Sequence, residues 1–435
     1  MGKDQRLLAE KQLLKAEQLF KARQFKKAGK NYHLAGNSLL KLNEFEEAKD
    51  CFINGAKTFM ELERYDTSIE LLRQSGEACL YADNFLEANQ IYKEAVEYVP
   101  KLKSEGDRSS NYILFAVLSY LCLFLKGNPD EGLDYLKRIQ KKVNKEFFKE
   151  NLLIQLVSEI TLSIRDNQFK YVDKIKENLG RYKFRDAEIK LLKYVMLLII
   201  SKMLIISTFE LDKDSYTTNE SINLVINFDT SSLPQILHDP YYQFEYREFI
   251  LNKISITLSD NLTTNKKPNL PIAIDVGKSS RLEFIIKPHF QVDNTVVGPF
   301  LFTCELNNNL IFTYETKSVA PKLISPPATL LTSVKNLRPP LIDQTFPLEI
   351  LIENKSEAEA LDVNIDVEFP EKLKIMRGTT KKQIYSLRIN EDLKWEINLK
   401  PLEAGDYLIK INIKFMDPDQ NKIEEMKEFP ISIKL

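Results

Sequence analysis

Residues that could carry catalytic chemistry are few and dispersed in this sequence. The histidines are His33, His238 and His289. No two of them are close enough in the sequence to suggest a metal site. The motifs GxSxG, GxxxxGKS/T and HExxH, which would mark a hydrolase, a phosphate-binding loop or a zinc protease, do not occur. We therefore expect a protein without catalytic activity, bound metal or cofactor.

The cysteines give the same indication. They are Cys51, Cys79, Cys122 and Cys304. They lie far apart and form no CxxC pair, so the sequence suggests neither a disulfide framework nor a zinc ribbon. Free thiols are typical of a reducing compartment, and the first residues lack the apolar core of a signal peptide. We expect a cytoplasmic protein.

Composition and charge argue against two further classes of protein, phosphate-loop proteins and nucleic-acid-binding proteins. Only 13 of 435 residues are glycine, which argues against glycine-rich phosphate loops. The net charge of −1 gives no reason to expect a nucleic-acid partner. Residues 1–200 hold 34 Lys and Arg against 29 Asp and Glu, whereas residues 201–435 hold 27 against 33. The two halves therefore differ in the sign of their charge.

Four segments of the first half resemble one another and begin twenty residues apart. They are FKKAGKNYHLAG, FEEAKDCFINGA, YDTSIELLRQSG and FLEANQIYKEAV, from Phe25, Phe45, Tyr65 and Phe85. Counted from the first aromatic residue, small residues recur at offsets 3 and 10 and a large residue at offset 7. Because these offsets lie on one face of an α-helix, each segment predicts one amphipathic helix.

Small residues at fixed places let neighbouring helices approach closely. Two units make a hairpin of about forty residues that cannot cover its own apolar face, so the copies should stack into a solenoid. The apolar runs 112–125 and 191–206 predict buried helices, because the first is short for a membrane span and Lys193 and Lys202 interrupt the second. We expect a helical domain over residues 1–206.

The pattern resembles known helical repeats. Tetratricopeptide repeats use aromatic, Ala, Tyr and Ala positions in this way, with a period of about 34 residues. The longer period of this chain resembles the α-SNAP group of solenoids, which are adaptors in SNARE disassembly. The resemblance covers residues 5–100. In that family the C-terminal end engages the NSF ATPase, and here more than two hundred residues of predicted β-structure replace it, which favours tethering or coat-like roles.

Two basic clusters are not explained by the repeat. The first cluster is Lys21, Lys26, Lys27 and Lys30; the second is Lys137, Arg138, Lys141, Lys142 and Lys145. Three lysines of the second, 137, 141 and 145, have the spacing of one helix face. Such faces fit an acidic helical or coiled-coil protein, as the α-SNAP resemblance implies, or an anionic membrane surface. The alternative is a solvated helix face.

From residue 207 the pattern changes to alternation. Segments 221–228, 253–258, 281–287, 300–306 and 310–316 have apolar or β-branched residues at period two, and predict a β-sandwich over residues 207–320. A connector with Pro321, Pro326 and Pro327 follows. About seven further short strands in residues 321–435 predict a second, immunoglobulin-like sandwich with Trp395 in its core.

The phrases ENKSEAEALDVNIDVEFPEKLKI and LKPLEAGDYLIKINIKF carry a second resemblance. They are similar to immunoglobulin-like domains of TRAPP tethering subunits, of adaptor and coatomer appendages, and of archaeal and bacterial surface modules. TRAPP subunits and appendages join helical solenoids to such domains in membrane trafficking. The pattern specifies the fold better than the function.

Residues 238–249, HDPYYQFEYREF, concentrate aromatic side chains in what should be a loop. The candidate binding residues there are Tyr241, Tyr242, Phe244 and Tyr246. Exposed aromatic side chains anchor interfaces, so this could be a binding loop. The other interpretation is a loop folded over the end of the sandwich.

Taken together, the sequence predicts an α-solenoid followed by two β-sandwiches, acting as a non-catalytic scaffold or adaptor in intracellular membrane trafficking. A cell-surface or secreted adhesion module is one alternative. A cochaperone of an AAA+ ATPase is another. The sequence does not indicate the oligomeric state.

Overall fold

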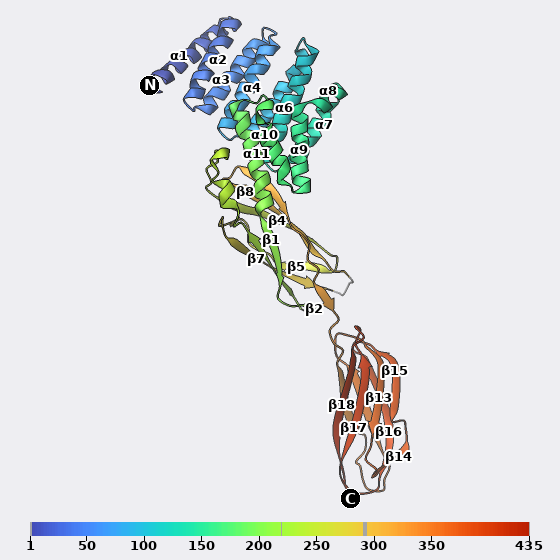
Figure 1. Cartoon of the computed structure of the whole chain (residues 1–435). Helices are drawn as coiled ribbons and strands as arrows, with labels where there is room; N and C mark the ends of the chain where they lie inside the picture. Colours follow the sequence, from blue (N-terminus) through green and yellow to red (C-terminus); the bar gives the residue numbers. More distant parts are fainter. Residues whose placement is uncertain (1, 219, 290–293, 435) are drawn as a thin grey trace.

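The computed structural model describes residues 2–218, 220–289 and 294–434, so Met1 and Leu435, at the ends of the predicted domains, lie outside it. The chain forms an elongated molecule, with a stack of helices at one end, a β-sandwich in the middle and a second β-sandwich at the other end (Figure 1). The predicted fold class, a helical stack followed by antiparallel β-sandwich domains, is confirmed.

The helical half contains eleven α-helices among the described residues. They are α1 (Gly2–Lys21), α2 (Phe25–Lys41), α3 (Phe45–Met60), α4 (Tyr65–Tyr81), α5 (Phe85–Tyr98), α6 (Glu105–Leu125), α7 (Pro129–Gln140), α8 (Lys145–Glu150), α9 (Leu152–Asp166), α10 (Phe169–Glu177) and α11 (Asp186–Leu204). Each helix from α1 to α6 packs against the next one in the chain. The four repeat segments are therefore successive members of one stack, as the spacing predicts.

The first aromatic residue of each repeat is the first residue of its helix. Two positions earlier, every connector has a residue with left-handed backbone geometry: Arg23, Asn43, Glu63 and Asp83, with φ between 53° and 62°. This geometry is uncommon outside glycine. Its recurrence every twenty residues shows that all four connectors turn the chain in the same way.

The offsets of the repeat have distinct packing roles. The small residues at offsets 3 and 10 are buried, and so are the large residues at offset 7. In α2 and α4 a glycine at offset 11 receives the aromatic ring of the next helix: a Cβ on Gly36 would lie 2.6 Å from the Phe52 ring, and one on Gly76 would lie 2.3 Å from the Tyr92 ring. Close approach of these backbones therefore depends on the missing side chain.

The two apolar runs are buried helices, as predicted. In α6 the residues from Tyr112 to Leu125 are all buried except Leu114, and most of α11 is buried as well. Among the described residues, α6 is one helix long and apolar enough to cross a membrane, and 72% of its most apolar stretch is buried inside the protein. A high proportion of buried residues is also a property of the central helix of a stack.

The first sandwich begins directly after α11. Its strands are β1 (Ile206–Leu211), β2 (Ser215–Thr217), β3 (Ile222–Asp229), β4 (Phe249–Leu258), β5 (Leu262–Lys266), β6 (Ile272–Ala273), β7 (Ser279–Pro288), β8 (Val297–Leu306), β9 (Leu310–Glu315) and β10 (Lys322–Ile324). The sheet orders are β1-β3-β7-β5 and β6-β4-β8-β9, and β10 pairs with β2 in parallel. A short helix, α12 (Leu233–Leu237), lies between β3 and β4.

The second sandwich has eight described strands, β11 (Leu330–Asn336), β12 (Phe346–Asn354), β13 (Ala360–Glu368), β14 (Leu373–Arg377), β15 (Lys381–Leu387), β16 (Asp392–Pro401), β17 (Gly405–Met416) and β18 (Lys422–Ile433). They form two sheets with the orders β11-β12-β16-β14 and β15-β13-β17-β18. Trp395 lies in its core, as predicted, with 8% of its surface exposed.

The apolar cores divide the molecule differently from the secondary structure. One continuous core runs from Ala9 in α1 to Leu323 in β10, so the helices and the first sandwich share it. The second sandwich has a separate core, from Ala328 to Ile433. Its packing therefore does not depend on the rest of the chain.

Candidate functional site

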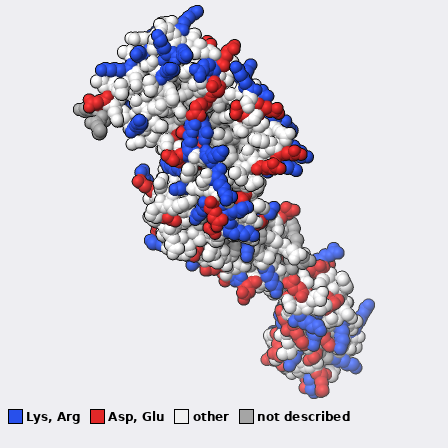
Figure 2. Space-filling model, turned by 45° about the horizontal axis from the view of Figure 1, so that its top comes forward, with Lys and Arg blue, Asp and Glu red and all other residues white. Residues whose placement is uncertain are grey.

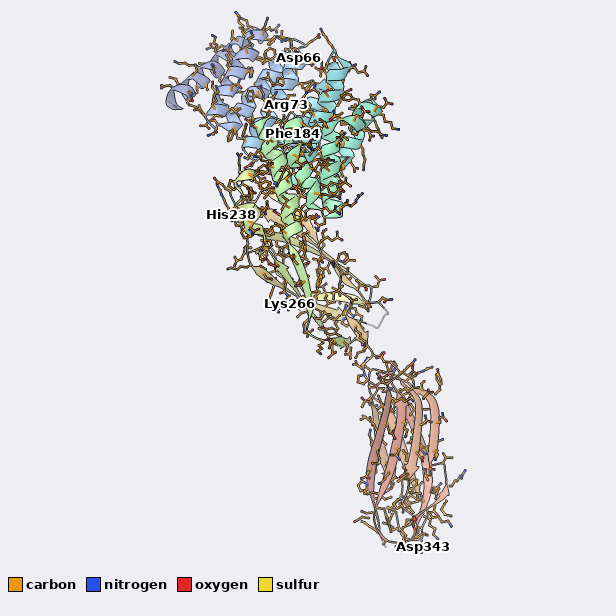
Figure 3. All side chains as sticks on the ribbon, in the orientation of Figure 1. Asp66, Arg73, Phe184, His238, Lys266 and Asp343 are labelled. Carbon is orange, nitrogen blue, oxygen red and sulfur yellow. The ribbon has the colours of Figure 1, made fainter. Side chains whose placement is uncertain are left out.

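Helix α11 packs across the stack, against α4 and α6. Arg73 of α4 donates two hydrogen bonds to the fully buried Glu188 of α11, at 2.7 and 2.6 Å (Figure 3 labels Arg73). Arg185, just before α11, pairs with Glu77 at 2.5 Å and with Glu70 at 2.7 Å. This side of the stack is occupied by the chain itself and is not a free binding surface.

The ion pairs of Glu77 do not fully offset the cost of burying its carboxylate. Burial raises the pKa of Glu77 to about 7, the charge of Glu188 adds to the rise, and Arg185 and Arg73 oppose it. Removal from water disfavours the carboxylate more than the arginines favour it. The contact between α4 and α11 thus contains one group that titrates near neutral pH.

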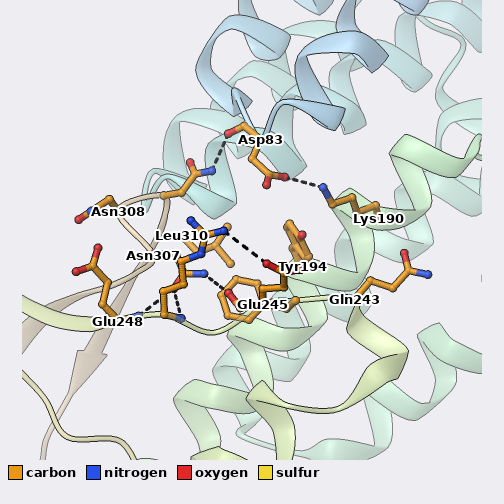
Figure 4. Close-up of a pocket in the computed structure, with 12 residues that line it drawn as sticks. Asp83, Lys190, Tyr194, Gln243, Glu245, Glu248, Asn307, Asn308 and Leu310 are labelled. Atoms are coloured by element: carbon orange, nitrogen blue, oxygen red, sulfur yellow. Dashed lines mark hydrogen bonds and ion pairs between the residues drawn. The ribbon is translucent and has the colours of Figure 1, made fainter. Parts of the chain in front are cut away.

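A polar pocket of about 420 Å³ lies where the helices meet the first sandwich (Figure 4). It is built from the turn before α5, from α11, from residues 243–248 and from the β8–β9 turn. Asp83 in that first turn is central: Lys190 pairs with its carboxylate at 3.0 Å, and the Asn309 side-chain amide donates to its backbone carbonyl at 2.7 Å. Lys126 in turn donates to the Asn309 carbonyl at 2.8 Å.

The remaining wall of this pocket is also made of contacts between distant segments of the same chain. The side-chain oxygen of Asn307 accepts hydrogen bonds from the backbone amides of Arg247 and Glu248, at 2.8 and 3.1 Å, and its amide group donates to the Glu245 carbonyl. The charged side chains of Glu245 and Arg247 point to solvent and pair with each other at 3.5 Å. This arrangement joins two parts of the chain, and it offers no nucleophile paired with a base.

The aromatic candidates of residues 238–249 lie at this same junction. Tyr242 is fully buried, and Tyr241, Phe244 and Tyr246 are half-buried. The Phe244 ring meets Tyr194 of α11 edge-on at 5.6 Å, and Lys193 lies 4.5 Å from the centre of the Tyr241 ring. These contacts favour the folded-loop interpretation, with the helices as the surface that the loop covers. A role in partner binding remains a prediction.

The histidines and cysteines are placed as structural residues. The ring of His33 lies beside Phe52, that of His238 bonds to the Pro234 carbonyl, and that of His289 bonds to Thr263. All four cysteines are buried and free. Burial raises the pKa of Cys51 and of Cys79 to about 12, so these thiols stay protonated and unreactive. No cluster of three metal-ligating side chains occurs in the part of the chain that the structure describes.

The first basic cluster lies at the start of the stack. Lys21, Lys26, Lys27 and Lys30 are all exposed, and none of them forms an ion pair with another described residue. The first turn of α3 carries Glu46 and Glu47, which suit the positive end of the helix dipole, whereas the first turn of α2 has no acidic residue. Helix α2 thus has lysines in its first turn, where the helix dipole favours acidic residues of the kind that α3 has.

The prediction that one helix carries Lys137, Lys141 and Lys145 is wrong. Helix α7 ends at Gln140, and Lys145 is the first residue of α8. The cause is Asn144, whose side chain accepts hydrogen bonds from the amides of Glu146 and Phe147 and so caps a new helix.

The second basic cluster, Lys137, Arg138, Lys141, Lys142 and Lys145, is nevertheless exposed. Some of its charge is engaged locally. Lys137 pairs with Asp134 at 2.7 Å, Arg138 lies over the Tyr135 ring, and Lys142 lies over the Tyr112 ring.

An apolar groove of about 390 Å³ adjoins this cluster, and sequence analysis did not find it. Helices α7 and α9 form its walls and both pack on α6. Its lining residues are Leu133, Leu136, Lys137 and Gln140 of α7, Phe148 of α8, and Ile154, Val157, Ser158, Thr161 and Leu162 of α9. On each wall they recur at the three- and four-residue spacing of a helix face.

In the face seen in Figure 2, Lys and Arg side chains are numerous over the helical half, where Asp and Glu side chains also occur, and both signs are intermixed on the sandwich at the other end. The basic cluster and the apolar groove together form the best candidate site in the described residues.

No protein-family model and no curated protein matches this sequence. Among solved structures, a cohesin module from a Clostridium perfringens family 33 glycoside hydrolase is 13% identical, covers 25% of this chain and 98% of its own, with a TM-score of 0.19. The ASH/PapD-like domain 7 of human CEP192 is 13% identical, covers 27% and 92%, with a TM-score of 0.18. A DUF4785 family protein from Legionella pneumophila is 13% identical, covers 53% and 57%, with a TM-score of 0.23. Scores this low carry no argument about function.

Proposed function

We propose that this chain is a non-catalytic, intracellular protein-interaction scaffold whose helical half binds an acidic amphipathic helix. The observation that carries the proposal is the groove between α7 and α9 beside the second basic cluster. An amphipathic helix buries its apolar face in such a groove and places its charged flanks against the rim. The cations at residues 137–145 select acidic flanks.

The face of the stack that α11 covers supports this choice of surface. Tetratricopeptide-type solenoids bind partners through exposed faces of the stack. Here α11 covers one such face and is held there by the Arg73–Glu188 pair. A partner helix therefore needs another surface, and the groove provides apolar side chains at helical spacing.

The absence of a catalytic role is part of the proposal. The described histidines bond to neighbouring groups or lie beside aromatic rings, and the two thiols of the repeats remain protonated. The junction pocket is lined by residues that join the helices to the first sandwich. This distribution suits a scaffold.

The similarity to α-SNAP-type solenoids and to TRAPP subunits or appendages suggests membrane trafficking as the setting. Both groups place a helical stack in an assembly around membranes, and the second joins it to immunoglobulin-like domains. We therefore propose a cytoplasmic adaptor of the tethering or coat type, with a protein helix as its first partner and an anionic membrane as a second, peripheral one. The first basic cluster at α2 is the candidate for the membrane contact.

The test uses the full chain and a defined probe, a fluorescein-labelled acidic peptide with leucines at helical spacing. We expect binding by fluorescence anisotropy, and we expect Ser158→Trp to abolish it, because Ser158 lines the groove and is exposed. The matched control is Gln155→Trp, one turn away on the same helix and outside the groove lining.

Charge is tested separately. Lys141→Glu with Lys145→Glu should weaken binding, whereas Lys101→Glu with Lys103→Glu, exposed cations elsewhere on the stack, should not. Equal binding by the Ser158→Trp and Gln155→Trp variants would exclude the groove. Sedimentation with phosphatidylserine vesicles, compared for the wild type and a Lys26→Glu/Lys27→Glu/Lys30→Glu variant of α2, tests the membrane contact.

A further inference from the structure

The second sandwich presents one lateral edge made by two consecutive strands. Strand β14 is the edge strand of one sheet and β15 is the edge strand of the facing sheet. Both lie on the same side of the sandwich (Figure 1). Among the described residues, no backbone hydrogen bond joins β15 to anything but its neighbour β13. The outer backbone groups of β15 are therefore available to another strand.

This edge is basic. Residues 372–382 contain five Lys or Arg residues and no Asp or Glu. Two of them are engaged: Lys372 pairs with Glu403, and Lys381 pairs with Asp366 at 2.9 Å. Lys374, Arg377 and Lys382 form no ion pair with another described residue. A free backbone edge thus coincides with uncompensated positive charge.

Apolar side chains accompany the charge. Tyr385 on β15 is 84% exposed, and Ile375 and Met376 on β14 are 40% and 51% exposed. An added strand would place alternate side chains beside these groups while its backbone pairs with β15.

The opposite lateral edge, formed by β11 and β18, also exposes apolar side chains such as Leu331 and Met426, and it differs in two other features. The Lys427 side chain of β18 donates to the Leu330 carbonyl of β11 and so links the two sheets. Strand β18 contains Pro430 near its end, and a proline cannot donate to an added strand. These are the ordinary devices that prevent pairing at an edge. The β14–β15 edge has charge on both strands and a register shift in β14, between Ile375 and Arg377, whereas the pairing of β15 with β13 is regular.

Charge on an edge strand selects the partner. Two copies of this chain would bring their lysines together, so the cations oppose pairing between copies. They favour a strand that carries carboxylates. We propose that the β14–β15 edge binds an extended acidic peptide segment of another protein by strand addition to β15. This inference does not depend on the groove between α7 and α9.

The probe is a fluorescein-labelled peptide of roughly ten alternating Val and Glu residues, enough to span a strand of this length. We expect the full chain to bind it. Arg377→Glu with Lys382→Glu should weaken binding at least about tenfold, because two attractions become repulsions. The matched control is Lys335→Glu with Arg338→Glu, which makes the same charge change at exposed positions in β11 and just after it.

Two further measurements separate strand addition from simple charge attraction. The same peptide with N-methyl groups on alternate amides keeps its charges and loses its backbone donors, so we expect it not to bind. Trp395 is the only tryptophan, and its indole donates to the Thr379 carbonyl between β14 and β15 at 3.3 Å. Its fluorescence should therefore change when the unmodified peptide binds.

The proposal is overturned by failure of the unmodified peptide to bind, by equal binding of the N-methylated peptide, or by equal binding to the Arg377→Glu/Lys382→Glu variant. If that variant is misfolded by circular dichroism, Arg377→Gln with Lys382→Gln replaces it, with a smaller expected loss. The Ser158→Trp variant should bind the Val and Glu peptide as the wild type does. Failure of the groove proposal and failure of this one are thus distinguishable.

Discussion

Replacing Gly76 by alanine tests whether the repeats pack as described. A Cβ at this position would lie 2.3 Å from Cε1 and 2.6 Å from Cζ of Tyr92, far inside van der Waals contact. Tyr92 is fully buried, so its ring has no open space into which to move. Overpacking of this kind costs about 1–3 kcal/mol.

The substitution also has a favourable part. Alanine in a helix interior is better than glycine by about 1 kcal/mol. The expected net loss in the free energy of unfolding is therefore up to about 2 kcal/mol, because the steric cost exceeds the gain in helix propensity. Gly106→Ala is the matched control, because its Cβ would meet only the Ser104 side chain, at 3.7 Å. That variant should be as stable as the wild type or slightly more stable.

The assay is urea unfolding followed by far-ultraviolet circular dichroism, which reports mainly on the helices. In a Tyr92→Leu background the clash is removed, so Gly76→Ala should cost much less there, and the double-mutant cycle isolates the contact. If Gly76→Ala is as stable as Gly106→Ala, or equally costly with and without the Tyr92 ring, α4 and α5 do not pack through this glycine. The description of the stack would then be wrong.

Two further predictions concern the contact between α4 and α11. Burial raises the pKa of Glu77 from 4.5 to about 7, so between these pH values the folded protein holds a proton that the unfolded chain releases. The free energy of unfolding should therefore rise by up to about 3 kcal/mol as the pH falls from 8 towards 5. Glu77→Gln should remove this part of the dependence of stability on pH. An unchanged slope in urea titrations of the variant would contradict the assignment. Arg73→Met should cost about 3–5 kcal/mol, because it removes the arginine that pairs with the buried Glu188 and leaves Glu188 with the hydrogen bond from the Arg185 backbone amide. Arg73→Met with Glu188→Gln should cost less; an equal cost would mean that the charge of Glu188 is not the reason.

Local rules in the sequence account for most of the fold. The twenty-residue spacing predicted the helices from α2 to α5, because the buried face of each helix needs small and large residues at the same offsets. The alternation of apolar and polar residues predicted strands such as β12 and β17, because every second side chain of such a strand faces the core. The left-handed connectors at Arg23 and Glu63 were not foreseen, because neither residue type favours that geometry. Their only signal is their position two residues before an aromatic helix start.

The break between α7 and α8 was predictable in principle. Asn144 is a strong N-cap residue and Glu146 follows in the first turn, which is a start signal for a helix. The even spacing of lysines concealed it, because a charged residue fits a helix face and a loop equally well. The groove could not be found in this way, since it depends on how α7 and α9 sit on α6.

The junction shows the limit of sequence reasoning most clearly. Asp83 meets Asn309 across 226 positions of sequence, and Tyr194 meets Phe244 across 50. None of these residues belongs to a periodic pattern that crosses the boundary between helices and strands. Their types permit many partners, and only tertiary packing selects one.

The distribution of cores explains how one chain could serve two partners. The groove between α7 and α9 belongs to the core that unites helices and first sandwich, whereas the β14–β15 edge belongs to a separate core. Between them lie Pro326 and Pro327, and β10 holds the chain to the first sandwich just before these prolines. Energetic coupling needs a packed element that both sites bias; this connector is held to the first sandwich by β10 and to the second by a hydrogen bond from the Ser325 amide to Asp419 at 2.9 Å. If both proposals hold, an adaptor of this kind would carry one ligand on the helical half and the other on the second sandwich, and would bring the two ligands together on one molecule.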